Sequence, residues 1–514
     1  MRALRQSFSL RARALACLAT ALLLLPQAAA AQTAPSPPPA APGAPPDFKL
    51  FRYDEDYRYL ADPSAPRDYW DPMKHIVLDR DYPIYLSVGG ELRERFEYYS
   101  APDFGLFGAK PNGYLLQRFL INSDLHVGDG FRAFVQLGSY FAFGKDFAAP
   151  PYEDQLDVQQ AFVDFRVPLA PEIGLAPILR AGRQEMAFGS QRIVAIRDAP
   201  NVRRAFDGFR LHAEMGNFHI DALAVRPVLN RLGVFDDPSN TNQALWGLYV
   251  TAMFAPGRGL DLYYLGYDNA RSAFAGSAGQ ETRQSIGLRL FGVAGGWDWD
   301  WEALWQFGSF ANRQILAWTV SSNTGYTFRE TPWSPRLGLK ADIASGDSTP
   351  GGRTVGTFNA LYPKLAYFNA AALVAPANVM DLQPSLAIRP FRNVAVTLGW
   401  DFLWRQTTQD AIYVEPFVAV PGTAGQGSSY IGNQIALDIA WQIDRHRTGL
   451  ARRLIDAVEA EARRRGLSGV RLGVRIVLTD NQRLFRSLGY REISREAHPG
   501  FDYPTSINMR KSLV

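Results

Sequence analysis

The densest group of residues suited to chemistry in this 514-residue chain is a run of arginines between Leu179 and Arg210. The run reads LRAGRQEMAFGSQRIVAIRDAPNVRRAFDGFR and holds seven arginines against three acids. A guanidinium group stays charged at any physiological pH, and its forked donors fit the two oxygens of a carboxylate. The run therefore predicts binding of an acidic polymer or a small organic acid, unless acids elsewhere in the chain neutralise it.

Further basic residues alternate with apolar neighbours in strand-like stretches: Arg93, Arg95, Arg118, Arg132, Arg166, Arg289 and Lys340. In a membrane barrel, an arginine facing lipid near the midplane costs about 2–4 kcal/mol, so these side chains are expected to face the lumen. Acids such as Glu91, Glu97 and Asp164 offer structural pairing as the alternative to solute binding. We expect the solute-binding pore lining to comprise Arg93, Arg95, Arg118, Arg166, Arg183, Arg192, Arg197, Arg203 and Arg204.

The elements that would position these residues are β-strands. From Leu86 to about residue 444 the chain alternates apolar and polar residues in about sixteen stretches of roughly ten residues. Near Trp297 the sequence Trp-Asp-Trp-Asp-Trp-Glu puts tryptophans on one face and acids on the other. Connections alternate between short ones, such as 128–130, and long ones, such as 345–376, with a short connection near 309–313 as the exception. The pattern predicts an all-β transmembrane antiparallel β-barrel over residues 86–444, with a soluble β-sandwich as the alternative.

The N-terminus has the features of an export signal. Four arginines precede an apolar core from Ala14 to Leu25, and small residues before Gln32 fit a cleavage site, so residues 1–31 are expected to be a signal peptide. It contains the only cysteine, Cys17. Residues 32–47 form a Pro/Ala-rich linker and residues 48–85 a periplasmic N-terminal segment. We expect the outer membrane of a Gram-negative bacterium as the location, with its lipid and the barrel-assembly machinery as partners.

Charge divides the chain into two unlike parts. The overall net charge is +4, but residues 445–514 carry a surplus of eight basic residues while residues 32–444 carry a net charge of −8. The basic balance is therefore no sign of a nucleic-acid partner. The last part has helical spacing at 449–465 and 481–488 around a strand pattern at 470–478, which predicts a short α/β segment.

Several motifs in order give the barrel part a family resemblance. The stretches GGELRERFEYY, GRQEMAFG, PNVRRAFDGFR, KADIASGD and TFNALYPK begin at residues 89, 182, 200, 340 and 357. Together they resemble the alginate export family of outer-membrane porins over about residues 48–446. The resemblance implies an eighteen-strand barrel and passive diffusion of an anionic polysaccharide such as alginate, or of related acidic solutes. Carried over by motif, the residues implied at the pore are Arg93, Arg95, Arg183, Arg203 and Arg204. The last two strands of the family pattern are absent here.

Residues 445–514 are similar to part of a different family. HRTGLARRLIDAVEAEARRRG (446–466) and DNQRLFRSLGY (480–490) resemble the second half of a GNAT-type N-acetyltransferase. The resemblance implies an acyl-CoA loop at Arg447, Thr448, Gly449, Leu450 and Ala451, where a helix N-terminus would accept a pyrophosphate. The family's first strands are missing, and export would separate the segment from acetyl-CoA. We therefore expect no enzyme and no catalytic residue, with acetyl-CoA-dependent acetyl transfer as the alternative function.

Other sites are weak. The six histidines have no metal-ligand spacing, so no metal is expected. Asp342 and Asp347 suit either a capped turn or a Ca²⁺ ligand pair. No nucleotide-binding or nucleic-acid motif occurs, so neither a cofactor nor a nucleic-acid partner is expected.

Overall fold

The computed structural model of the chain consists of two compact units. The larger spans Met1–Thr327, Leu339–Gln383 and Asp401–Asn433, and the smaller spans Phe328–Gly338, Pro384–Trp400 and Gln434–Val514. The structure describes residues 49–441 and 458–513 apart from gaps at 63–64, 66–69, 80, 103–104, 106–109, 147–148, 171, 173, 199, 275, 369–370, 392, 461, 476–481, 483–484 and 497–505. The expected signal peptide, the linker and the acyl-CoA loop at 447–451 lie outside the described residues.

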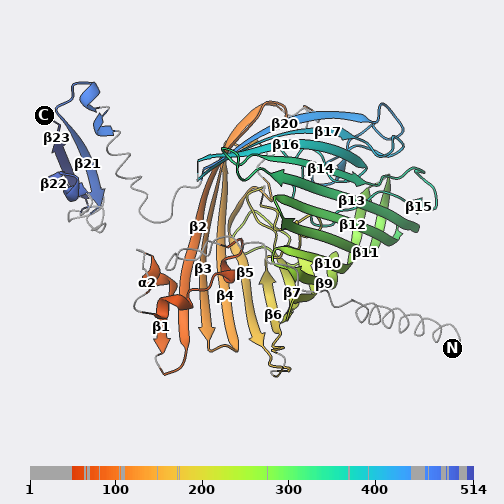
Figure 1. The fold of residues 1–514 in the computed structure, drawn as a ribbon, viewed down its shortest axis with the longest axis horizontal. Helices are drawn as coiled ribbons and strands as arrows, with labels where there is room; N and C mark the ends of the chain where they lie inside the picture. The colour runs from red at the N-terminus through yellow and green to blue at the C-terminus, as the bar shows by residue number, and fades with distance from the viewer. Residues whose placement is uncertain are drawn as a thin grey trace. The chain divides into compact units, whose positions relative to one another are not determined.

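The fold is an all-β membrane barrel of the outer-membrane type, whose long strands are drawn in Figure 1. Its long strands are β2 (Ile84–Tyr99), β3 (Asn112–Val127), β4 (Phe131–Phe143), β5 (Asp154–Arg166), β6 (Ile178–Gln184), β7 (Phe206–Met215), β8 (Phe218–Pro227), β9 (Gln243–Ala255), β10 (Arg258–Phe274), β11 (Ser277–Ala294), β12 (Trp297–Phe310), β13 (Arg313–Thr327), β14 (Arg336–Ala344), β16 (Val379–Phe391), β17 (Val394–Trp404) and β20 (Tyr430–Trp441). The short strands β1 (Ile76–Asp79) and β15 (Thr354–Val355) bring the sheet to eighteen. Consecutive strands from β1 to β13 pair antiparallel.

The number of long strands agrees with the predicted sixteen. Within the described residues the barrel is not closed. The sheet begins at Ile76, ten residues before the predicted boundary, because β1 pairs with the start of β2.

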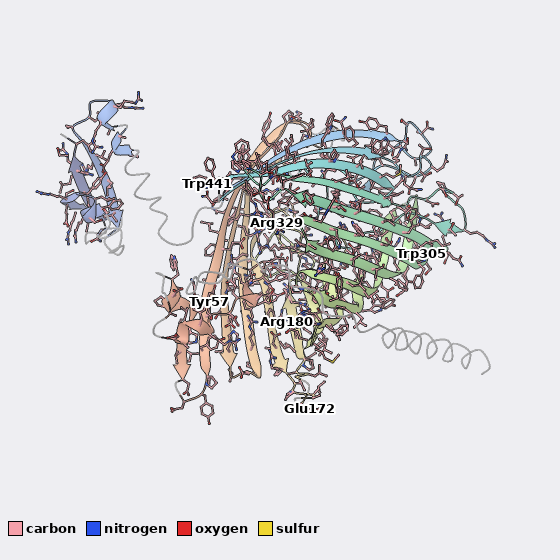
Figure 2. The ribbon with its side chains drawn as sticks, viewed as in Figure 1. Tyr57, Glu172, Arg180, Trp305, Arg329 and Trp441 are labelled. Carbon is pink, nitrogen blue, oxygen red and sulfur yellow. The ribbon has the colours of Figure 1, made fainter. Side chains whose placement is uncertain are left out.

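Alternation along each strand gives the sheet two chemically different faces. In β3, Arg118, Leu120 and Asn122 are buried, whereas Phe119 and Ile121 between them are exposed. Trp305 on β12 is half exposed, whereas Arg180 on β6 is buried (Figure 2). A soluble sandwich would bury its apolar face, so exposed apolar and buried charged faces exclude that alternative and fit a barrel in lipid.

No helix in the described part of the chain has the length and apolarity to cross a membrane.

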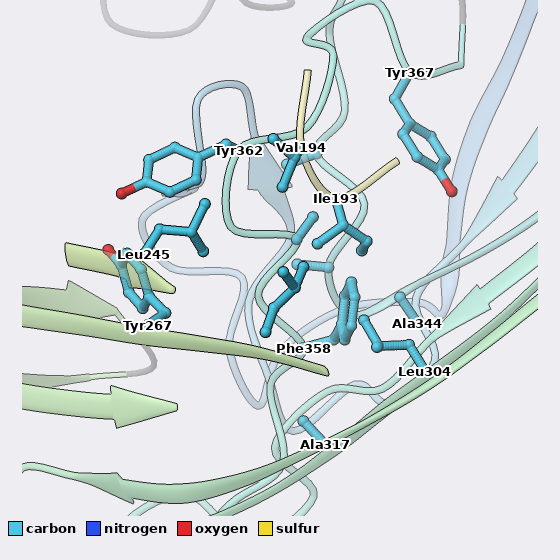
Figure 3. Packing of buried hydrophobic residues seen from close by; sticks show 14 of the residues in the cluster. Ile193, Val194, Leu245, Tyr267, Leu304, Ala317, Ala344, Phe358, Tyr362 and Tyr367 are labelled. Carbon is cyan, nitrogen blue, oxygen red and sulfur yellow. The ribbon is translucent and has the colours of Figure 1, made fainter. Parts of the chain in front are cut away.

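The buried face is covered by long connections rather than by a second sheet. We call residues 185–205, between β6 and β7, the inner loop. Its Ile193 and Val194 pack with Phe358 and Tyr362 of the β14–β16 connection in one apolar cluster (Figure 3). Backbone bonds join the two connections, since Ala195 N–H donates to Tyr362 O at 2.8 Å and Tyr362 N–H donates to Ile193 O at 2.9 Å.

Short connections end the remaining hairpins. The turn at 311–312 between β12 and β13 is short, as expected from sequence, and Ala311 and Asn312 adopt positive φ there. The connection from β10 to β11 is equally short, which the sequence pattern did not indicate.

The N-terminal segment contains the short helical turns η1 (Arg52–Asp54), η2 (Arg58–Ala61) and α2 (Asp71–Lys74). Tyr53 of η1 stacks on Phe51 and meets the rings of Phe134 and Phe162 edge-on. These contacts bury the segment against β4 and β5.

The C-terminal segment has a sheet of its own. Strands β21 (Gly469–Arg475), β23 (Ser506–Ser512) and β22 (Arg491–Glu496) pair antiparallel in that order. The strand predicted at 470–478 corresponds to β21, and described residues in both predicted helices are helical. In the β17–β20 connection, strands β18 (Tyr413–Val414) and β19 (Val418–Ala419) pair antiparallel in one small sheet.

Candidate functional site

Arg118 of β3 attaches the inner loop to the sheet. Its side chain is fully buried. The guanidinium donates to Asn201 O at 2.8 Å and to Asp198 Oδ1 at 2.6 Å, with longer bonds to Asp198 O and Pro200 O. Arg203 of the loop reaches the same Asp198 oxygen at 2.9 Å. Arg118 and Arg203 therefore both form ion pairs with Asp198, and these pairs have a structural role.

The electrostatics of Asp198 follow from these pairs. Burial acts to raise the pKa of Asp198, but the guanidinium groups of Arg118 and Arg203 outweigh it and hold that pKa well below its ordinary value. Asp198 is therefore ionised at neutral pH. The loop and strand stay joined by charge-assisted hydrogen bonds, which are stronger than neutral ones.

Four other predicted arginines also contact acids. Arg93 contacts Asp198, and Arg95 contacts Glu97. Arg183 donates to Asp207 at 2.9 Å. Arg192 donates to Asp300 at 2.7 Å and to Glu302 at 3.0 Å. With Arg118 and Arg203, six of the nine predicted arginines thus have acid partners, so the structural alternative applies to most of them.

Three predicted arginines have no ion pair in the described part of the chain. Arg166, the last residue of β5, is exposed. Arg197 donates only to Val202 O and Asn230 Oδ1, and its Nε has no partner. Arg204 lies over the Tyr362 ring at 4.9 Å, and its Nη1 has no partner. Burial, and then the charge of the neighbouring Arg204, lowers the pKa of Arg197 to about 9.

Two adjoining cavities occupy the short-turn end of the sheet, and we call them the vestibule. The larger measures about 580 Å³ and the smaller about 310 Å³. Both are lined by Asp54, Arg132, Asp164, Arg166 and Ile178. The larger cavity also contacts the β3–β4 turn at Gly128–Gly130, and its volume falls in the range of small-molecule sites. Arg166 is the predicted site residue that lines both.

The vestibule lining contains both signs of charge. Arg132 pairs with Asp124, and Arg180 holds Asp164 through two bonds of 2.8 Å. Arg180 also lies over the rings of Tyr53 and Phe162. Arg166 has no acid partner among the described residues, and Asp54 and Asp129 have no basic one. Free donors and free acceptors therefore both face the space.

The N-terminal segment supplies part of this lining, and sequence reasoning missed it. Tyr53, Asp54, Glu55, Asp56 and Arg58 all border the larger cavity. Nothing in their spacing indicated it, because the contacts with β4 and β5 join residues about eighty and about 110 positions apart. Arg180 and Arg210 belonged to the arginine run but were not among the predicted lining residues.

The remaining predicted sites have plain structural partners. Asp347 accepts from Arg313 at 2.7 Å and from Thr349 N–H at 3.1 Å, which is a capped turn. Asp342 lies 3.3 Å from Lys340, but neither of its buried carboxylate oxygens has a hydrogen-bond partner in the described part of the chain.

A small cavity of about 50 Å³ separates Arg204 from Glu415 of the β17–β20 connection. Glu415 Oε1 has no hydrogen-bond partner among the residues that the structure describes. Burial raises the pKa of Glu415 to about 8, while the Arg204 charge opposes that rise. Glu415 is therefore mainly protonated at neutral pH, and Arg204 lacks a charged neighbour there.

This pKa predicts how stability depends on pH. Below about pH 4.5, the ordinary value for Glu, both states hold the proton. Between about 4.5 and 8 only the folded state holds it, so the free energy of unfolding falls as pH rises and levels off above 8. Urea titrations from pH 4 to 9 measure this slope, and Glu415→Gln should flatten it. An unchanged slope in Glu415→Gln would show that other groups cause it.

Comparison with known proteins identifies one family model, alginate export, which matches residues 84–458. No curated protein matches the chain. Among solved structures, Pseudomonas aeruginosa OccK11 (OpdR) has 12% identity and a TM-score of 0.43, covering 72% of this chain and 87% of that one. Pseudomonas aeruginosa OccD3 (OpdP) has 12% identity and a TM-score of 0.45, covering 73% and 85%. Vibrio cholerae OmpT has 10% identity and a TM-score of 0.39, covering 71% and 99%.

Proposed function

Because this chain belongs to the alginate export family, we propose that it is an outer-membrane channel through which uronates and their polymers diffuse passively. The short turns of such barrels face the periplasm, so the vestibule would be the periplasmic entrance. No covalent step is needed, because diffusion requires binding that is weak enough to release the solute.

The observation that carries this proposal is Arg166. It is exposed, it lines both cavities of the vestibule, and it has no acid partner among the described residues. An arginine already paired with an acid offers little to a solute carboxylate, because the charge of each is largely cancelled. A free guanidinium can form the bidentate bond that carboxylates favour.

The mixed lining supports a hydroxyl-rich acid over a simple inorganic anion. Each uronate unit carries one carboxylate and several hydroxyl groups. The carboxylate would bind Arg166, while the hydroxyls would donate to Asp54 and Asp129, which border the same space. Arg197 and Arg204 would continue the positive path along the inner loop, since neither is neutralised by an acid within bonding distance.

Solute flux into proteoliposomes tests the proposal. The refolded full-length protein should let galacturonate enter several times faster than galactose, which has the same ring and no charge. Protein-free liposomes are the control. Equal rates for the two sugars would contradict acid preference, and no flux of either would contradict a channel.

A further inference from the structure

Three aspartates gather where β5 meets the β8–β9 connection, at the long-loop end of the sheet and away from the vestibule. Asp154 and Asp157 lie on β5, and Asp237 lies in the connection. One carboxylate oxygen of each lies within 4.8 Å of the other two. Asp154 is 1% exposed and Asp157 is 5% exposed, so the group is withdrawn from water.

Hydrogen bonds fix two of the three carboxylates. Asp157 Oδ2 accepts from the backbone N–H groups of Asp236 at 2.8 Å and Asp237 at 3.1 Å. Asp237 accepts from Arg231 N–H at 2.5 Å and from Asn230 Nδ2 at 2.9 Å. The connection therefore brings Asp237 to β5 in a defined position.

Asp154 differs from the other two. Its Oδ1 is buried and has no hydrogen-bond partner in the described part of the chain. A buried carboxylate oxygen without a partner is costly, and nearby like charges raise that cost. Asp154 thus combines an orphaned buried oxygen with a carboxylate oxygen within 4.8 Å of two further carboxylates, an arrangement that a bound cation would satisfy.

The protein's own cations do not neutralise the cluster. Arg183 is the basic residue in contact, and its Nη1 is 3.5 Å from Asp157 Oδ1. It makes a shorter bond, 2.9 Å, to Asp207. Asp236 adds a second orphaned carboxylate oxygen beside the group.

We propose that Asp154, Asp157 and Asp237 bind a Ca²⁺ ion that ties the β8–β9 connection to the start of β5. Ca²⁺ bonds oxygen at 2.3–2.6 Å, so ligand oxygens around one ion lie up to about 5 Å apart, as here. All three donors are hard carboxylate oxygens with no His or Cys, which disfavours zinc. Mg²⁺ requires a tighter octahedron and retains its waters, so it should bind more weakly.

Calorimetry with CaCl₂ on the full-length protein, refolded in detergent without lipopolysaccharide, tests the site. The wild type should bind one Ca²⁺ per chain, with MgCl₂ at least tenfold weaker. Asp154→Asn and, separately, Asp237→Asn should each lower Ca²⁺ affinity at least tenfold. Asp146→Asn is the matched control, because Asp146 is exposed at the same end of the sheet and should leave binding unchanged.

Thermal unfolding supplies a second readout. In EDTA, Asp154→Asn should unfold at or above the wild-type midpoint, because it removes repulsion. In Ca²⁺ the order should reverse, since the ion stabilises only the state that binds it. Absence of saturable wild-type binding up to 10 mM CaCl₂, or equal Ca²⁺ shifts in wild type and Asp154→Asn, would overturn the site. Neither readout depends on solute passage, so failure here is distinct from failure of the channel.

Discussion

Replacing Arg166 with Gln should weaken block of the channel by an oligouronate about 10- to 100-fold. A charge-assisted hydrogen bond is worth about 1.5–3 kcal/mol, and each 1.4 kcal/mol changes an equilibrium constant tenfold. Arg166 has no acid partner in the described residues, so its replacement leaves no buried carboxylate without a partner. The fold should be unaffected. Concentration-dependent block of the current, measured on wild type and variant, gives the ratio.

Arg231→Gln is the control for this change. Arg231 is exposed in the β8–β9 connection, away from the vestibule, so the same loss of charge should leave block unchanged. Equal weakening by both variants would indicate a diffuse effect of net charge. No weakening by Arg166→Gln would remove the observation on which the proposed solute rests.

Replacing Arg118 with Ala should lower the free energy of unfolding by about 1.5–3 kcal/mol, the range for a hydrogen bond to a charged group, because its partner Asp198 is half exposed and keeps Arg203. Arg118 is fully buried and donates to Asp198 and to backbone oxygens of the inner loop. Its loss leaves Asp198 with fewer partners and the loop more loosely attached to β3, through Asn201 and Val202. The released loop should also give larger and noisier single-channel currents. Urea unfolding and current recordings measure the two effects.

Two comparisons make the Arg118 result specific. Arg271→Ala removes an exposed arginine and should change the free energy of unfolding by less than about 0.5 kcal/mol. Arg118→Lys keeps the charge but loses the forked donors of the guanidinium group. Its free energy of unfolding should therefore lie between those of the wild type and Arg118→Ala. Normal stability with quiet currents in Arg118→Ala would show that the other contacts of the inner loop are sufficient to hold it.

The strands and their two faces were predictable because strand periodicity is local. Tryptophans at 297, 299 and 301 had to share a face, and Trp297 and Trp301 are indeed about half exposed while Glu302 is buried. The start of the sheet at Ile76 was not predicted, since β1 is too short to show alternation.

Whether each arginine has an acid partner could not be predicted from its position in the sequence. Arg118 meets Asp198 across eighty residues of sequence, and Arg192 meets Asp300 across more than a hundred. Such contacts depend on how long connections fold over the buried face, which sequence periodicity does not encode. For the same reason the vestibule's N-terminal wall was missed, and the three unpaired arginines could not be separated from the six paired ones.

Single-channel conductance of the refolded full-length protein in a planar bilayer tests the central claim most directly. The account predicts stepwise currents that favour anions and that a polyuronate blocks from the side bearing the short turns, while neutral dextran of equal length does not. Block should weaken as salt rises, because charge attraction is screened. Stepwise currents that favour cations and ignore polyuronate would contradict the claim.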